Sequence, residues 1–125
     1  MKKIIVFCSA MLLIVFVKVN VSQAQTAAKA DAKVTLTGEI VDMDCYMSMG
    51  AHGADHKGCA MKCIANGTPM GLLTSDGKVY VLTAPHDNQD PYNKLKKEAA
   101  ATVTVTGEVY TRGGVQSLQV DGVKM

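Results

Sequence analysis

The stretch that decides the fold is VTVTGEVY at residues 103–110, which shares its pattern with VTLTGEI at residues 34–40. In both stretches apolar side chains alternate with Thr or Glu, which is the period-2 pattern of a half-buried β-strand. Each contains one glycine, Gly38 or Gly107, where a long strand would have to bend sharply to close a small barrel. We therefore expect two long, bent strands within one folded unit.

Two glycine-containing turns predict hairpins. One is TSDG at residues 74–77 and the other is RGG at residues 112–114, and each lies between apolar or alternating stretches. Together with the two long stretches, these hairpins give five predicted strands. The strands are expected at about residues 34–40, 70–73, 78–82, 103–110 and 115–123.

Two helices are predicted between the strands. Asp90 and Pro91 are typical of a helix start, and this helix continues to Ala100. The other runs from about Ala54 to Ala65 and carries cysteine and histidine. The predicted fold is mainly β: a small five-stranded OB-like barrel, with one helix between strands 3 and 4 and the Cys/His-bearing helix inserted between strands 1 and 2.

The first 24 residues predict a bacterial export signal. Lys2 and Lys3 precede a mostly apolar run at residues 4–17, and small residues flank a cleavage site after Ala24. This run is shorter than the roughly 20 residues of a membrane span, so we expect no stable span after cleavage; an uncleaved anchor is the alternative. The expected organisation is a signal peptide at 1–24, a flexible leader at 25–33 and an OB-like domain at 34–125, in a periplasmic or secreted protein.

Length and charge limit the domain count and the possible partners. The chain has 125 residues, of which about 100 would remain after cleavage, so there is room for one small domain. The full chain has a net charge of +2, and loss of the signal leaves ten basic against eleven acidic residues. Such a balance gives no electrostatic footprint for nucleic acid, and no nucleic-acid partner is expected.

Three cysteines and two histidines lie within nineteen positions: Cys45, His52, His56, Cys59 and Cys63. On a helix, His56, Cys59 and Cys63 would share one face, with Cys45 approaching from the end of the first strand and His52 as an alternate ligand. Three thiols with imidazole suit Zn(II), or copper in its soft Cu(I) form. The predicted cofactor is therefore a copper or zinc ion.

Disulfide formation is the main alternative to a metal site. In an oxidising compartment Cys45 would pair with Cys59 or Cys63 and pin the inserted helix to the barrel. The protein would then be a disulfide-stapled binding module for a peptide, glycan or small ligand. Three cysteines cannot all pair within one chain, however, so one thiol would need another role. Catalysis ranks third, because no paired acid and base or oriented nucleophile is evident.

Methionines and a third histidine allow two interpretations each. Met47, Met49 and Met61 could be copper ligands, but methionine in a small core more often fills space. His86 lies in a predicted loop and is expected to be a solvated side chain rather than a ligand.

The cysteine and histidine segment also carries a resemblance. Its pattern is Cys45-Tyr46, then His56-x2-Cys59-Ala60-x2-Cys63, then Gly67-x-Pro69. Over about residues 34–125 the chain resembles a group of small exported bacterial proteins that look like OB-fold barrels. The resemblance implies the fold and the export, and it brings no activity with it. Separately, the Cys59-x3-Cys63 spacing resembles that of cytochrome oxidase copper centres and their assembly chaperones, so the expected partner is an exported redox or metal-handling protein.

Overall fold

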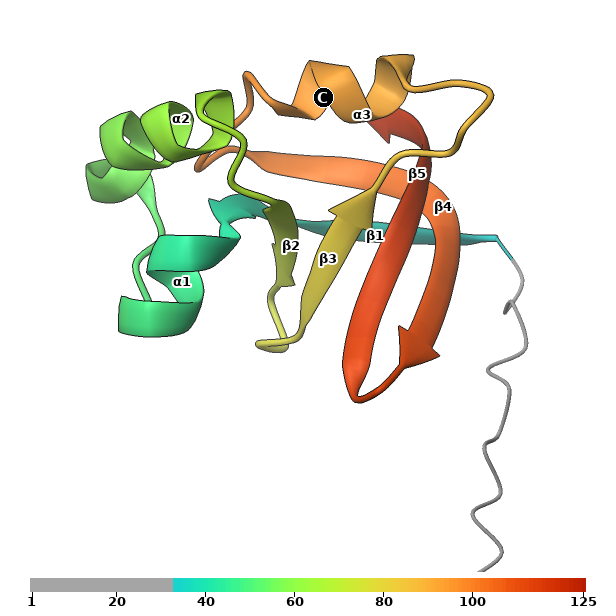
Figure 1. Ribbon diagram of the computed structural model, residues 1–125, viewed down its shortest axis with the longest axis horizontal. Coiled ribbons are helices and arrows are strands. Elements are labelled where there is room, and N and C mark those ends of the chain that lie inside the picture. The colour runs from blue at the N-terminus through green and yellow to red at the C-terminus, as the bar shows by residue number, and fades with distance from the viewer. Residues whose placement is uncertain (1–32) are drawn as a thin grey trace, which may run out of the picture.

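The structure is a computed structural model that describes residues 33–125. The predicted signal peptide and all of the predicted leader except Lys33 lie outside the described residues. Five strands and three α-helices follow in chain order (Figure 1). They are β1 (Val34–Asp42), α1 (Met43–Met49), α2 (Lys57–Ala65), β2 (Met70–Thr74), β3 (Val79–Thr83), α3 (Asp90–Leu95), β4 (Thr102–Arg112) and β5 (Val115–Lys124), with a short 3₁₀ helix η1 (Ala54–His56) before α2.

The five strands pair in a closed ring in the order β1-β2-β3-β5-β4, with β4 returning to β1. Four of the pairings are antiparallel, whereas β3 and β5 run parallel. The β2–β3 and β4–β5 hairpins form at the two predicted turns. The predictions of a mainly β fold, five strands and a helix between the third and fourth strands are confirmed.

Glycines in the long strands β1 and β4 lie where these strands approach their neighbours closely. β1 pairs with β4 up to Glu39 and with β2 from Gly38 onward, so the strand changes partner at Gly38. A Cβ atom on Gly38 would lie 2.5 Å from the carbonyl oxygen of Leu73. In β4 the register shifts between Thr106 and Gly107, and a Cβ atom on Gly107 would collide with the backbone of Gln119. A side chain at either position would collide with the backbone of a neighbouring strand, so only glycine fits there.

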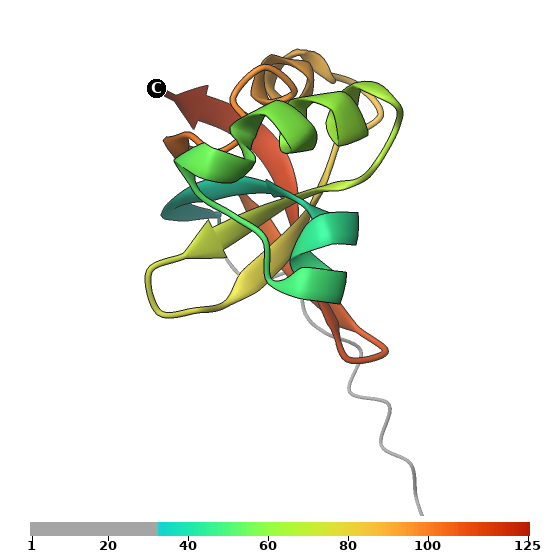
Figure 2. The ribbon, with the colours of Figure 1, turned by 90° about the vertical axis from the view of Figure 1, so that its left-hand side faces the viewer.

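The core fills the ring and extends under two helices. Ile40, Leu72, Val105 and Leu118 are fully buried strand residues. They belong to one apolar cluster with Leu95 of α3 and Ile64 of α2, and both helices lie over the same side of the ring in Figures 1 and 2. Burial of these side chains contributes about 1.5–3 kcal/mol each. Helix α2 is thus anchored to the core on one face while its other face is left for chemistry.

The segment between β1 and β2 differs from the prediction. It contains two α-helices and a 3₁₀ turn, where the sequence predicted one helix from Ala54 to Ala65. The additional helix, α1, ends at Met49 and is capped by Gly50, which adopts the left-handed conformation with φ of 67°. Likewise, α3 ends at Leu95 and not at Ala100. No helix within residues 33–125 is long and apolar enough to span a membrane.

Candidate metal centre

Asp42 positions the first cysteine. It is the last residue of β1, it is fully buried, and its Oδ1 accepts the backbone N–H of Cys45 at 2.9 Å. This is an N-cap bond, which satisfies a free amide in the first turn of a helix. The cap fixes the direction in which α1 leaves the sheet. Cys45 is therefore turned inward on the first turn of α1, with 8% of its surface exposed.

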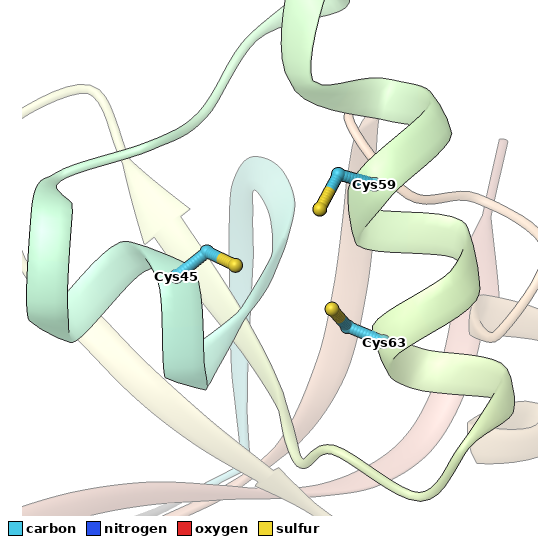
Figure 3. Close-up of side chains that lie close together, drawn as sticks. All are labelled: Cys45, Cys59 and Cys63. Carbon is cyan, nitrogen blue, oxygen red and sulfur yellow. The ribbon is translucent and has the colours of Figure 1, made fainter.

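Helix α2 supplies the other two cysteines. Cys59 and Cys63 are four residues apart, so they lie one above the other on the same helix face. Neighbouring positions Ala60 and Ile64 are buried against the core and fix the rotation of the helix. That rotation points both cysteines toward Cys45 (Figure 3). Burial falls from Cys45, which is buried, through Cys63 to Cys59, which is exposed.

The three sulfur atoms form a compact cluster. The Sγ atoms of Cys45, Cys59 and Cys63 all lie within 4.8 Å of one another. All three are free thiols, so the predicted disulfide does not form among the described cysteines. Three soft donors that converge from two helices could hold a single soft metal ion. The structure thus brings together all three cysteines that the sequence predicted as ligands.

A second group shares Cys45 with the first. Ligand atoms of Asp42, Cys45 and His56 lie within 4.8 Å of one another. His56 Nε2 donates to Asp42 Oδ2 at 3.0 Å, and the His56 side chain is only 17% exposed. Asp42 is not among the ligands predicted from the sequence. The available signal was an acid three residues before Cys45, which is the spacing of an N-cap residue to the amide it accepts.

The environment keeps Cys45 protonated. Burial, the hydrogen bond to the Asp42 carboxylate and the neighbouring Cys63 raise the pKa of Cys45 to about 12. The pKa of Cys63 is also raised, chiefly by burial, although its hydrogen bond with Cys45 acts in the opposite direction. A metal ion would therefore have to displace protons that the protein holds firmly, as any thiolate ligand requires.

Asp42 itself stays ionised. Burial pushes its pKa upward, but hydrogen bonds from Cys45 and His56 outweigh burial and bring the pKa below 3.8. A buried carboxylate needs such partners, because an unpaired charge is costly to bury. The site therefore contains one fixed negative charge beside the thiol cluster.

His52 lies apart from both groups. Its Nδ1 is 3.5 Å from Glu39 Oε2, and half of the side chain, 51%, is exposed. The ring meets Tyr46 edge-on, and His52, Glu39 and Tyr46 line a surface hollow of about 540 Å³. The structure therefore does not bring this predicted alternate ligand to the thiols.

Three of the four methionines in α1 and α2 are not core residues. Met47, Met49 and Met61 are 66%, 71% and 42% exposed, so the interpretation as core filling is wrong for all three. Met61 lies two positions from both Cys59 and Cys63, which places it on the opposite side of α2. His86 is exposed in the segment before α3, as expected.

Comparisons with known proteins assign no family. No family model, no curated protein and no solved structure matches the chain.

Proposed function

We propose that this protein is an exported, OB-like metal-binding protein that holds one copper or zinc ion through Cys45, Cys59 and Cys63. The single observation that carries the proposal is the convergence of three free thiols, with all Sγ atoms within 4.8 Å of one another. The strand order, with its parallel β3–β5 pairing, supports the OB-like description. Export rests on the predicted signal at residues 1–24.

The size of the cluster suits a small thiolate-bound ion. Zinc–sulfur bonds are about 2.3 Å long, so three thiolates around one ion lie about 4 Å apart. The three Sγ atoms all lie within 4.8 Å of one another, so only small side-chain rotations would be needed to place them around one ion. The helices need not move, because the buried neighbours of Cys59 and Cys63 already hold α2 in place.

His56 is the best-placed fourth ligand. It shares the Asp42 and Cys45 group, and it is the only histidine in either group of three clustered ligand atoms within residues 33–125. Structural Zn(II) is almost always four-coordinate, so three thiolates leave one position to fill. The soft Cu(I) ion favours thiolate ligands. Recruitment of His56 would thus accompany zinc binding, with Asp42 outside the coordination shell.

The exposure gradient supports a role in metal carriage or in the assembly of a redox partner. Cys59 is the exposed member, so another protein's sulfur or nitrogen ligand can reach the ion from that side. Cys45 is buried and would be the last ligand to dissociate from the ion. An exported metal-handling or redox protein is the partner class that such stepwise ligand exchange fits.

The test measures metal stoichiometry and affinity on reduced protein without oxygen. Zn(II) and Cu(I) are titrated separately against a chromophoric chelator, and native mass spectrometry counts the bound ions. We expect one ion per chain, lost in the double variant Cys59→Ser with Cys63→Ser. His56→Ala should weaken zinc about 10- to 100-fold, while His52→Ala, its matched control, and His86→Ala should leave affinity unchanged. Full retention of metal by the double cysteine variant contradicts the proposal.

A further inference from the structure

The two cysteines of α2 cannot form a disulfide with each other. Cβ atoms at positions i and i+4 of a helix are about 6 Å apart, whereas a disulfide requires about 3.8 Å. Cys59 and Cys63 are such a pair within continuous helix. Closing that gap would require α2 to unwind around Ala60, which is 2% exposed and packed in the core cluster.

Cys45 is therefore the shared disulfide partner of the cluster. It comes from a different helix, and its Sγ lies within 4.8 Å of both other sulfurs. In Figure 3 its side chain points into the space between Cys59 and Cys63. The Sγ proximity leaves two alternative disulfides, Cys45–Cys59 and Cys45–Cys63, and they exclude each other because both consume Cys45.

We infer that the thiol cluster is also an oxidation site: a disulfide-bearing oxidant converts it to a single disulfide that always contains Cys45, and this conversion releases the metal. The release rests on the proposed function, whereas the disulfide connectivity does not. Oxidation leaves one thiol, on α2, where the metal needs three. Metal binding and disulfide formation are thus two states of one site.

The reaction balances as two thiol–disulfide exchanges. The Cys59 thiolate, the accessible member, attacks one sulfur of the oxidant, forms a mixed disulfide and displaces the first thiolate of the oxidant. The Cys45 sulfur then attacks Cys59 Sγ, breaks the mixed disulfide and displaces the second thiolate. Cys45 and Cys59 lose two electrons and two protons, and the oxidant gains both as two thiols. Exchange of Cys63 for Cys59 gives the second isomer without further oxidation.

The experiment maps the disulfide with oxidised glutathione as the oxidant. Free thiols of the treated metal-free protein are blocked with iodoacetamide before trypsin digestion. Cleavage after Lys57, Lys62 and Lys78 places each cysteine in a separate peptide, since Cys45 precedes Lys57, Cys59 lies at 58–62 and Cys63 lies at 63–78. Cys8, where retained, falls in a fourth peptide at 4–18. We expect every cross-linked pair to contain the Cys45 peptide and one α2 peptide to be alkylated.

Single variants give the matched controls. Cys59→Ser and Cys63→Ser should each still form an internal disulfide, whereas Cys45→Ser should yield only glutathione adducts on Cys59 and Cys63. A cross-link between the 58–62 and 63–78 peptides in the wild type, or an internal disulfide in Cys45→Ser, overturns the connectivity. Circular dichroism of Cys45→Ser checks that α2 is intact, and wild-type mapping decides the question without that variant.

A second readout tests the release of metal. Zn(II) affinity is measured on reduced protein, on glutathione-oxidised protein and on the oxidised sample after phosphine reduction. We expect a loss of about 100-fold or more on oxidation and full recovery on reduction. Equal affinity before and after oxidation overturns the release. If the reduced protein binds neither zinc nor copper, the proposed function is contradicted. The peptide map still decides the disulfide connectivity, which does not depend on metal binding.

Discussion

Asp42 Oδ2 accepts a hydrogen bond from His56 Nε2 at 3.0 Å, so the last residue of β1 is tied directly to the residue that precedes α2. The other oxygen of the same carboxylate caps α1 through Cys45. One buried side chain thus sets the positions of both helices that carry the thiols. The geometry of the cluster depends on Asp42 as much as on the cysteines themselves.

Replacement of Asp42 should therefore destabilise the protein strongly. Asp42→Ala removes the cap and leaves the buried amide of Cys45 and the partly buried ring N–H of His56 without their acceptor, which costs about 2–4 kcal/mol in the free energy of unfolding. Asp44→Ala, an exposed acid two residues later, should change stability by no more than about 0.5 kcal/mol. Urea denaturation of the reduced, metal-free proteins measures both, and equal midpoints for the two variants would contradict the role given to Asp42.

Low pH should remove the contribution of the Asp42 carboxylate to the free energy of unfolding. Its pKa is below 3.8 in the folded protein, so the carboxylate stabilises the fold fully above the pKa of the unfolded chain. As the pH falls below about 4, the unfolded state takes up more protons than the folded state, and stability declines until the folded-state pKa is passed. The variant Asp42→Asn should show a shallower decline between pH 5 and pH 2, as measured by urea unfolding. A decline of unchanged steepness would argue against this account.

Cys45 should be the slowest thiol to react. Because its pKa is about 12 and it is 8% exposed, few thiolates are available to an alkylating reagent at pH 8. Timed iodoacetamide labelling of reduced, metal-free protein, followed by trypsin, reports the rate of each cysteine separately. Labelling in urea is the control, and there the three rates should converge. Asp42→Asn should accelerate Cys45 in the folded protein, since it removes the carboxylate that raises the pKa.

The glycine bends can be tested with a matched pair in the same hairpin. Gly107→Ala would drive a Cβ into the backbone of Gln119 and should cost about 1–3 kcal/mol or more. Gly122→Ala places its Cβ no nearer than 4.0 Å to Thr106 and should be tolerated. Thermal unfolding of the two variants compares them directly. Similar melting temperatures would show that β4 and β5 can separate at the bulge without penalty.

The strands could be predicted from sequence because their signals are local. The alternation at 34–40 and 103–110 and the glycines of the turns appear within a few residues of one another, and the structure keeps them. Helix α1 was missed because its seven residues, MDCYMSM, show no apolar periodicity. Its start depends on the buried side chain of Asp42, and burial is set by tertiary packing.

His52, predicted only as an alternate ligand, shows why the spacing of two histidines does not by itself bring both to the thiols. The pattern His52-x3-His56 puts two histidines on one face only if the helix is continuous between them. Gly53, with φ of 84°, interrupts the chain there, and the helix begins only after it. His52 is therefore free to turn toward Glu39, while His56 stays next to Asp42.

Metal binding should release protons in a number that counts the thiol ligands. Each cysteine ligand must lose its proton, so Zn(II) binding to three thiols at pH 7 should release about three protons per chain. Calorimetric titrations in two buffers of different ionisation enthalpy give this number from the difference in observed heats. Cys45→Ser should lower the count by about one and weaken binding, whereas Met61→Leu, on the opposite side of α2, should alter neither. Identical heats in the two buffers would mean that the ion binds without displacing thiol protons, which a cysteine-coordinated site does not permit.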